Sequence, residues 1–317
     1  MNRKKFLQVS ATTTLGSIFP FQSIIDSVDA NKKMAIQLFS LPKMCIADFP
    51  GTVKMLSGMG YKELELFGPY PFSTQKAKDN WAAIAPMVGF SGSGYFDRDI
   101  KEVKKILDDH GLSSPSAHTD LDTLINKMGA LGEAAHTLGH KYVVLPSIPD
   151  EYRKSIDDYK KIAETFNTIG AEAKKNGIRF AYHNHGYGIK PKDGIIPLEI
   201  IINNTDPDLV YLEMDIFWTT AGGADPVQLL TKFPNRYKML HIKDMKHKTQ
   251  FSGDGGDASQ WVALWGEMTT AGDGVLDLIS LFKQAKKSGI EHYIVEQDLV
   301  SDPNIALKKS IDYLKKI

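Results

Sequence analysis

The sequence predicts an α/β fold in which one domain, residues 31–317, forms a (β/α)8 or TIM barrel. Short β-type runs alternate eight times with longer helical patterns, as such a barrel requires. A glycine stands just past the end of several helical patterns, which is typical of a loop that leads from a helix into a strand. The main alternative is an open doubly wound sheet, and no GxGxxG motif follows the first strand to support it.

Eight runs of mostly β-branched, aromatic and other apolar residues are predicted to be the strands of the barrel. They are Ala35–Ser40, Glu63–Phe67, Pro115–Thr119, Tyr142–Ser147, Arg179–His185, Val210–Asp215, Met239–Asp244 and His292–Gln297. The clearest helical patterns between and after them are Asp99–His110, Leu121–Leu138, Ile156–Asn176, Val275–Ser288 and Asn304–Lys316. The first four of these helical patterns are each followed directly by a glycine.

Two connections, residues 68–97 and 245–274, are too long to be plain loops. Each follows a strand and precedes a helix, so in a barrel both lie on the face that carries the active site. Both are rich in aromatic residues and glycine, and aromatic faces suit the apolar C–H faces of sugar rings. We therefore expect both connections to shape a substrate pocket, although such aromatic residues also serve to pack loops onto a barrel.

Residues 1–30 have the order of an export signal. Basic residues Arg3-Lys4-Lys5 precede a moderately apolar stretch, Phe6–Ile25, and Val28-Asp29-Ala30 offers small or β-branched residues at a cleavage site. The run Arg3–Gln8 resembles a degenerate twin-arginine signal, so either the Sec or the twin-arginine route is open. An amphipathic first helix of the domain is the alternative. We expect an exported, periplasmic protein.

The composition limits the partners. Lys+Arg number 38 and Asp+Glu 38, so the formal net charge is zero, which argues against a nucleic-acid partner. The single cysteine, Cys45, excludes an internal disulfide framework and any CxxC site. No apolar run reaches the roughly 18 to 20 residues of an integral membrane span. The expected partner is a small-molecule carbohydrate. The sequence leaves open whether the chain also forms a homo-oligomer.

Ionisable residues replace the usual Val, Ile and Leu at the ends of several predicted strands. They are Glu63 and Glu65, His118, His183 and His185, Glu213 and Asp215, His241 and Lys243, Glu296 and Asp298. A spacing of two residues places each pair on one face of its strand. Because burying many ionisable groups is costly, they must be compensated by one another, by a metal ion or by a polar ligand.

Asp215, His241 and Glu296 are the metal ligands that we predict. A mixed set of carboxylate and imidazole ligands suits Mn²⁺, Zn²⁺, Co²⁺ or Fe²⁺ better than Ca²⁺. We expect one divalent metal ion, with Mn²⁺ as the first expectation and Zn²⁺, Co²⁺, Fe²⁺ or Mg²⁺ as alternatives.

At these residues the chain resembles the sugar phosphate isomerase/epimerase family of xylose-isomerase-like TIM barrels. The resemblance spans residue 35 to the C-terminus and is carried by Tyr182-His183-Asn184-His185, Leu212–Trp218, Leu240–Asp244, Gly272-Asp273-Gly274 and Ile294–Asp298. It implies one divalent metal at the barrel mouth, held by Glu, Asp, His and Glu from the fifth to the eighth strand. The Asp, the His and the last Glu correspond to Asp215, His241 and Glu296.

The sequence departs from the family pattern at the first ligand. Relatives often have His-Asn-His-Asp-Phe-Glu-Phe after the fifth strand, whereas this chain has His183–Ile189 with Gly188 in place of the ligand Glu. Water, substrate or His185 could take the coordination position that the missing Glu leaves open. The family's epimerases use two opposed carboxylates as bases, and one of the two is missing here. The resemblance therefore favours a reaction with one base. Elimination or hydration of a ketosugar, as in the related inosose dehydratases, and aldose–ketose isomerisation are such reactions.

The expected reaction removes a proton next to a carbonyl group. We assign the catalytic roles to Glu296 as base, His185 as a rival base or leaving-group acid, and Lys243 as the group that stabilises an oxyanion. The predicted substrate-binding residues are Glu65, His118, His183 and Trp218. His183 is a further rival base.

An exported enzyme would meet unphosphorylated sugars, and no Lys/Arg cluster is present to hold a phosphate. A free sugar, a glycoside or a ketosugar such as a 3-ketoglucoside is therefore the expected substrate of a metal-dependent isomerase/epimerase or 3-ketosugar lyase/hydratase. Two alternatives differ in class. One is a non-catalytic carbohydrate-binding protein on a degraded enzyme scaffold. The other is a phosphodiesterase like endonuclease IV, which the neutral charge and Gly188 disfavour.

Overall fold

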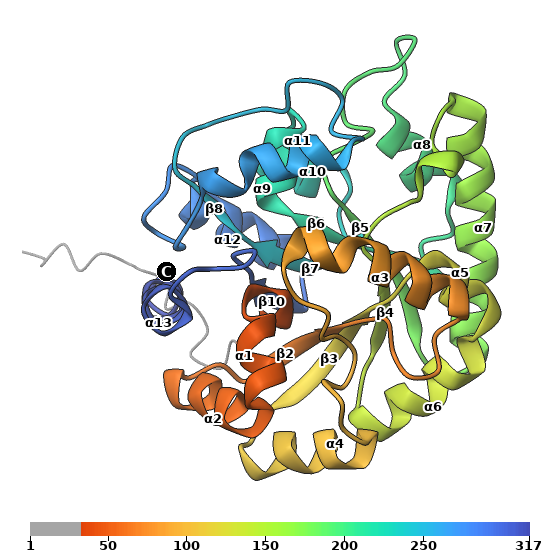
Figure 1. Cartoon of the computed structure of the whole chain (residues 1–317). Coiled ribbons are helices and arrows are strands. Elements are labelled where there is room, and N and C mark those ends of the chain that lie inside the picture. Colours follow the sequence, from red (N-terminus) through yellow and green to blue (C-terminus); the bar gives the residue numbers. More distant parts are fainter. Residues whose placement is uncertain (1–32) are drawn as a thin grey trace, which may run out of the picture.

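The computed structural model describes residues 33–317, which form the predicted closed barrel (Figure 1). The predicted export signal, residues 1–30, lies outside the described residues. Eight parallel strands close the barrel, with β10 pairing with both β7 and β1. They are β1 (Met34–Gln37), β2 (Glu63–Phe67), β3 (Ser113–His118), β4 (Tyr142–Leu145), β5 (Arg179–Asn184), β6 (Val210–Asp215), β7 (Tyr237–Ile242) and β10 (His292–Val295).

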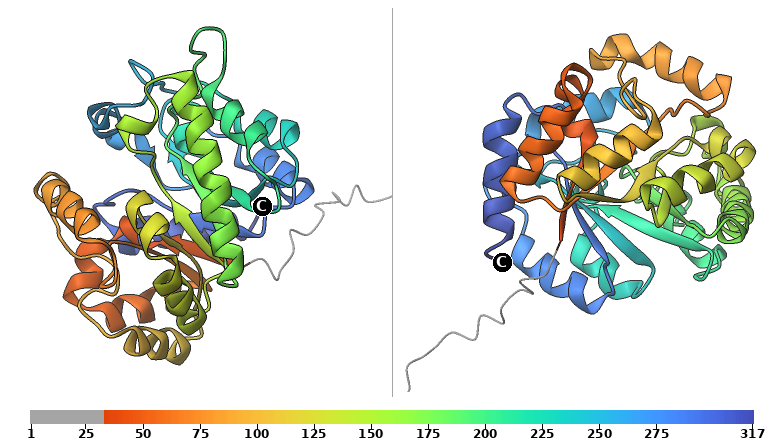
Figure 2. Two further views of the ribbon diagram at one scale, coloured as in Figure 1. Left: turned by 90° about the vertical axis from the view of Figure 1, so that its right-hand side faces the viewer. Right: turned by 90° about the horizontal axis from the view of Figure 1, so that it is seen from below.

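Helices ring the outside of the strands (Figure 2). They are α1 (Pro42–Ala47), α2 (Phe49–Met59), α3 (Gln75–Val88), α4 (Ile100–Asp109), α5 (Leu121–Asn126), α6 (Met128–Leu138), α7 (Ile156–Lys175), α8 (Pro197–Asn204), α9 (Ile216–Ala221), α10 (Pro226–Lys232), α11 (Ala258–Leu264), α12 (Leu278–Lys287) and α13 (Pro303–Leu314). No helix in residues 33–317 is long and apolar enough to cross a membrane.

Each predicted strand is confirmed, with small changes at the ends. The first strand stops at Gln37 because its side-chain oxygen accepts a hydrogen bond from the Phe39 backbone N–H at 3.2 Å, which turns the chain into the 3₁₀ helix Leu38–Ser40. The predicted helix Leu121–Leu138 is two helices, since Lys127 has φ −131° and leaves the helical region. The predicted glycine after α6, Gly139, has φ 89° and ends that helix.

Both long connections contain secondary structure of their own. Residues 68–97 contain α3, and residues 245–274 contain α11 and the 3₁₀ helix Trp265–Glu267. In the second connection, β8 (Asp244–Met245) pairs with β9 (Met268–Thr269) in a short antiparallel ladder. Both connections leave the barrel from the carboxyl ends of their strands, as expected.

The barrel interior changes from apolar to polar along the strands. Ala35, Ala181, Met239 and Ile294 are fully buried and belong to one apolar cluster. Two residues further along the chain in each case lie Gln37, His183 and His241 on the same strands and Glu296 just after β10. Because side chains two apart on a strand share a face, the polar layer rests directly on the apolar one.

A buried histidine at the amino end of the barrel, His140, is expected to make the folded protein less stable in acid. The buried His140 ring donates its Nδ1 proton to the Ser114 carbonyl at 2.7 Å, and burial lowers the pKa of His140 to about 4. The unfolded chain binds this proton near pH 6.5, so stability falls as pH drops from 6.5 towards 4. Between pH 7 and pH 4.5 we expect wild type to lose about 2 kcal/mol more than His140→Gln in denaturant unfolding. Equal losses would contradict the assignment.

Candidate active site

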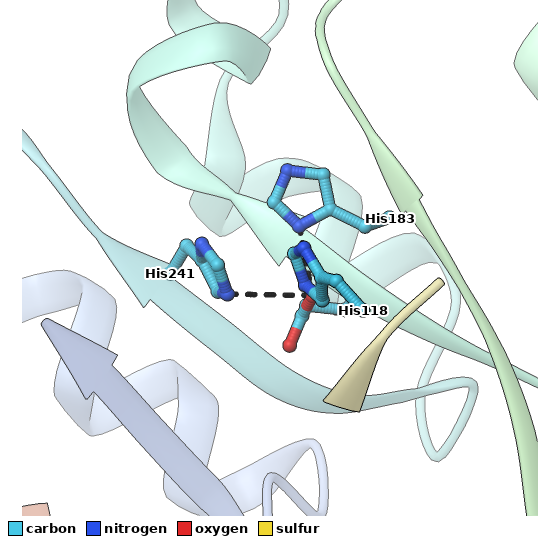
Figure 3. Close-up of side chains that lie close together, drawn as sticks. His118, His183 and His241 are labelled. Carbon is cyan, nitrogen blue, oxygen red and sulfur yellow. Dashed lines mark hydrogen bonds and ion pairs between the residues drawn. The ribbon is translucent and has the colours of Figure 1, made fainter. Parts of the chain in front are cut away.

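The polar layer centres on three imidazoles that converge inside the barrel (Figure 3). His118 comes from β3, His183 from β5 and His241 from β7. Glu213 Oε2 accepts hydrogen bonds from His118 Nε2 and His183 Nδ1, both at 2.8 Å, and lies 3.4 Å from His241 Nε2. A single carboxylate on β6 therefore ties three strands together.

Glu65 on β2 is the second carboxylate of this cluster. Its Oε2 lies 2.6 Å from His241 Nε2 and 3.2 Å from His118 Nε2, and it accepts a hydrogen bond from Gln37 Nε2 at 2.8 Å. Glu65 is fully buried and does not line the cavity described below. We predicted that Glu65 binds a substrate hydroxyl or orients another group, and its contact with His241 fits the second of these roles.

The cluster is strongly charged. Burial alone would lower the pKa of His118, but the carboxylates of Glu65 and Glu213 raise it to about 9. Burial favours protonation of the two carboxylates, yet His118 and His241 hold their pKa values far below the ordinary range. At neutral pH His118 is therefore an imidazolium paired with these two carboxylates.

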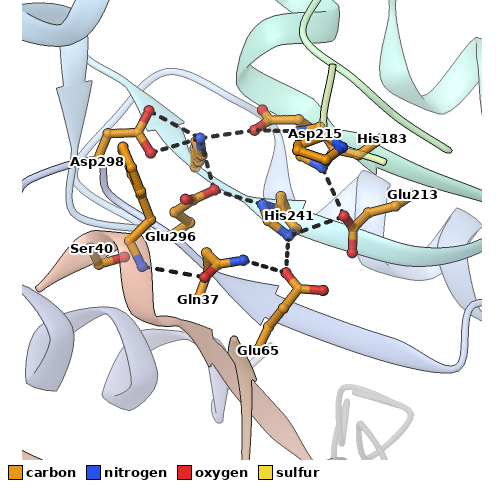
Figure 4. Close-up of polar contacts among 12 residues, drawn as sticks. Gln37, Ser40, Glu65, His183, Glu213, Asp215, His241, Glu296 and Asp298 are labelled. Atoms are coloured by element: carbon orange, nitrogen blue, oxygen red, sulfur yellow. Dashed lines mark hydrogen bonds and ion pairs between the residues drawn. The ribbon is translucent and has the colours of Figure 1, made fainter. Parts of the chain in front are cut away.

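The three predicted metal ligands come together beside this cluster (Figure 4). Asp215, His241 and Glu296 each offer a ligand atom, and these atoms lie within 4.8 Å of one another. Asp215 Oδ1 caps α9 by accepting a hydrogen bond from Trp218 N at 2.9 Å, and its Oδ2 makes an ion pair with Lys243 but accepts no hydrogen bond. His241 Nδ1 lies 2.6 Å from Glu296 Oε2.

His241 thus has one nitrogen towards the predicted ligands and the other towards Glu65. A metal-binding histidine in proteins commonly donates its second ring N–H to a carboxylate, which fixes the orientation of the ring. The arrangement of His241 and Glu65 fits this pattern.

Lys243 is buried among three carboxylates. Its Nζ lies 3.1 Å from Asp215 Oδ2, 2.8 Å from Glu296 Oε2 and 2.9 Å from Asp298 Oδ1. Burial opposes the charge, but these carboxylates raise the pKa of Lys243 well above its ordinary value. Lys243 therefore stays an ammonium, and Asp298 is its partner outside the predicted ligand set.

Two neutral imidazoles point lone pairs into this region. The Nδ1 proton of His183 goes to Glu213, so His183 Nε2 has no partner and lies 3.8 Å from Asp215 Oδ2. His185 donates its Nδ1 proton to the Pro146 carbonyl, and burial, then Lys243, lowers the pKa of His185 to about 3. Both rings are bases or ligands rather than acids at neutral pH.

The donor set fits a divalent cation. Five buried carboxylates meet here: Glu65, Glu213, Asp215, Glu296 and Asp298. The cationic side chains His118 and Lys243 face them, and the carboxylates also raise the pKa of His241, which would release a proton on binding an ion. Burial raises the pKa of Asp215 in spite of Lys243, and it raises the pKa of Asp298 to about 7. Negative charge is in excess, and a divalent ion would compensate it.

A cavity of about 430 Å³ opens above these residues. Six of the predicted site residues line it: His118, His183, His185, Trp218, Lys243 and Glu296. Asp215 and His241 are fully buried beneath them. The two predicted long connections supply the outer wall through α3 and α11.

Gly188, at the position where the resemblance implies a ligand Glu, lies in the loop after β5 with φ 73°. A Cβ atom built there would meet the Tyr159 hydroxyl at 3.1 Å and Pro197 at 3.4 Å. Gly188 does not line the cavity. A side chain at this position would start out towards Tyr159 of α7 and Pro197 of α8.

Three residues of the site had no predicted role. Gln37 and Glu213 hold the cluster together, and Asp298 anchors Lys243. Glu213 and Asp298 lie two residues from Asp215 and Glu296, so the same period-two pattern marks them. Gln37 has no such sign, because it occurs alone at the end of an apolar strand.

Comparison with known proteins shows the family of the chain. The profile of the family described as "Xylose isomerase-like TIM barrel" matches residues 51–317. An inosose dehydratase of Clostridium perfringens is 28% identical over 263 residues, which cover 73% of this chain and 86% of that protein. These matches, with the solved structures below, confirm the predicted family resemblance and an enzyme of the isomerase/epimerase or ketosugar dehydratase type.

Two solved structures are similar. A sugar phosphate isomerase/epimerase from Parabacteroides distasonis shares 29% identity at a TM-score of 0.68, covering 94% of this chain and 98% of that one. The IolI protein, solved with a zinc atom, shares 16% identity at a TM-score of 0.62 and covers 90% of this chain and 95% of its own. At that identity the second likeness shows the fold alone.

Proposed function

The chain belongs to the family of xylose isomerase-like TIM barrels, and from this we propose a metal-dependent enzyme that removes a proton next to the carbonyl group of an unphosphorylated ketosugar or glycoside. Its reaction is an isomerisation or epimerisation, or a ketosugar elimination or hydration. The observation that carries the proposal is the convergence of Asp215, His241 and Glu296 beneath and beside a cavity whose lining includes the neutral imidazoles of His183 and His185.

Asp215, His241 and Glu296 would hold the ion, and the free Nε2 of His183 is the nearest unpartnered nitrogen to Asp215. The zinc atom reported for the IolI structure supports a divalent ion here, and Mn²⁺ remains our first expectation. Such an ion acts as a Lewis acid that polarises a carbonyl group.

The chain's own residues would move the proton. Glu296 lines the cavity, and Lys243 and His241 outweigh its burial and keep its pKa well below the ordinary range. It is therefore a carboxylate at neutral pH and the first candidate for the base. His185, neutral with its Nε2 unbound, is the second candidate. The Lys243 ammonium, on the cavity wall, would stabilise negative charge on a substrate oxygen.

The cavity supports an unphosphorylated substrate. Among the described residues that line it, Lys243 is the single Lys or Arg, and three carboxylates already surround Lys243. A phosphate dianion would meet no unpaired cation there and would face Glu296 and Asp298.

We further propose that the protein is exported to the periplasm with cleavage after Ala30, where unphosphorylated sugars are the available substrates. The order of basic, apolar and small residues in 1–30 supports this. A mature chain in the periplasmic fraction that begins at Asn31 is expected. A cytoplasmic chain that keeps Met1 would contradict the proposal.

The direct test is hydrogen exchange from the substrate. Residues 31–317, loaded with Mn²⁺, are incubated in D2O with unphosphorylated ketosugars, and deuterium at the carbon next to the carbonyl is followed by NMR. We expect enzyme-dependent exchange that Glu296→Gln lowers by about 10²–10⁴-fold, the usual contribution of a general base.

Glu291→Gln is the matched control, because Glu291 lies at the amino end of the barrel among Lys141, Arg179 and Lys238. Equal loss in the two variants would contradict the role of Glu296. Sugar binding without exchange for every ketosugar tried would favour the carbohydrate-binding alternative.

A further inference from the structure

The cavity above the candidate active site has two chemically different parts. Its floor is formed by imidazoles, Lys243 and carboxylates. Its outer part, the apolar mouth, is formed by Trp81, Ile84 and Met87 of α3 and by Trp261, Val262 and Trp265 in or just after α11. The two helices leave the barrel three strands apart, after β2 and β7.

The apolar mouth exposes large aliphatic side chains. Ile84 is 42% exposed, Met87 55% and Val262 40%. Exposed apolar side chains that gather around one cavity, rather than lying singly on the surface, are typical of a ligand-binding site. The other exposed large apolar residues of the described chain, such as Ile125, Ile279 and Ile305, do not line this cavity.

Two indoles of the mouth offer carbon faces rather than polar atoms. Trp81 Nε1 donates to the Ser91 carbonyl and Trp261 Nε1 to the Gly255 carbonyl, both at 2.8 Å. Trp261 also packs against His185, with ring centroids 5.2 Å apart. Because His185 belongs to the floor, the aromatic wall continues directly from the polar site.

We propose that the substrate is a glycoside whose oxidised sugar lies on the polar floor while an uncharged aromatic aglycone lies between α3 and α11. This inference rests on the proposed function and names its substrate class. A free monosaccharide carries hydroxyl groups around its ring and would leave the mouth facing water. The volume of about 430 Å³ falls in the range that encloses a drug-sized ligand. Asn80 is the one polar residue of α3 that lines the cavity, and no charged side chain of that helix lines it to pair with a charged aglycone.

Binding of a matched pair of probes tests the proposal. The affinities of phenyl 3-ketoglucoside and methyl 3-ketoglucoside for metal-loaded residues 31–317 are measured by calorimetry. We expect the phenyl compound to bind at least about tenfold more tightly, because its ring is removed from water between the two helices. The triple variant Ile84→Ser, Met87→Ser and Val262→Ser should reduce this ratio to about twofold.

The control is the triple variant Ile125→Ser, Ile279→Ser and Ile305→Ser, which changes equally exposed residues away from the cavity and should keep the wild-type ratio. Equal affinity of the two probes for wild type, or the same ratio in the cavity variant, would overturn the proposal and leave the proposed function standing. Binding of neither probe would also overturn the aglycone site, and hydrogen exchange with other ketosugars would then decide the proposed function separately. A dimer of the wild type that the cavity variant abolishes would show that a second copy covers the mouth, and would also overturn the aglycone site.

Discussion

Replacing Asp215 by Asn is expected to remove the bound divalent ion and to lower turnover by about 10³-fold or more while the barrel stays folded. A ligand carboxylate supplies charge that an amide lacks, and Lewis-acid stabilisation of several kcal/mol corresponds to this loss of rate. Metal content by mass spectrometry, ketosugar exchange and thermal unfolding are measured together.

The choice of Asn follows from the double role of Asp215. Its Oδ1 caps α9 through Trp218 N, and its Oδ2 faces Glu296 and Lys243. Asn caps a helix as well as Asp does, so Asp215→Asn separates the charge from the cap, whereas Asp215→Ala would lose both.

Asp225→Asn is the matched control. Asp225 caps α10 by accepting hydrogen bonds from Val227 N and Gln228 N and is not among the metal-site residues. This variant should keep the ion and the activity. Full metal content in Asp215→Asn would contradict the assignment of Asp215 as a ligand.

Replacing Glu213 by Ala is expected to destabilise the protein by about 3–5 kcal/mol, the usual cost of removing one partner from a buried ion pair. Glu213 accepts hydrogen bonds from His118 and His183 and lies beside His241, so its loss leaves three buried imidazoles without their shared acceptor. Chemical denaturation at pH 7 measures the effect, and the melting temperature should fall by about 10 °C.

A surface pair provides the comparison. Glu199 pairs with Lys232 at 2.5 Å, but the Lys232 side chain is 54% exposed. Glu199→Ala should cost less than about 1 kcal/mol, because water screens such pairs. Similar losses for Glu199→Ala and Glu213→Ala would show that the buried cluster does not stabilise the barrel as we infer.

The fold could be predicted because every repeat of the barrel carries its own local signals. Apolar runs of strand length, helical periodicity and a glycine after the helix recur, and the closed sheet confirms them. Helix α3 and the break at Lys127 could not be predicted in this way. The helix α3 packs its aromatic side against Phe67 and Phe90 through Trp81, and such tertiary contacts leave no clear pattern in a loop sequence.

The candidate site could be predicted in its residue types but less well in its roles. The sequence pattern placed Asp215, His241 and Glu296 at corresponding ends of three strands, and the structure brings their ligand atoms together. Periodicity cannot tell how deep a residue lies, so it did not separate the buried Glu65 from His118, which lines the cavity. Depth depends on the stagger between neighbouring strands, which the sequence does not display.

The most direct test of the central claim is an anomalous diffraction measurement on crystals of residues 31–317 grown with Mn²⁺. We predict one strong anomalous peak, surrounded by Asp215, His241 and Glu296, and its loss in Asp215→Asn crystals. A peak among His118, His183, Glu213 and His241, the other group of described residues able to hold an ion, would contradict the claim. So would the absence of any peak inside the barrel.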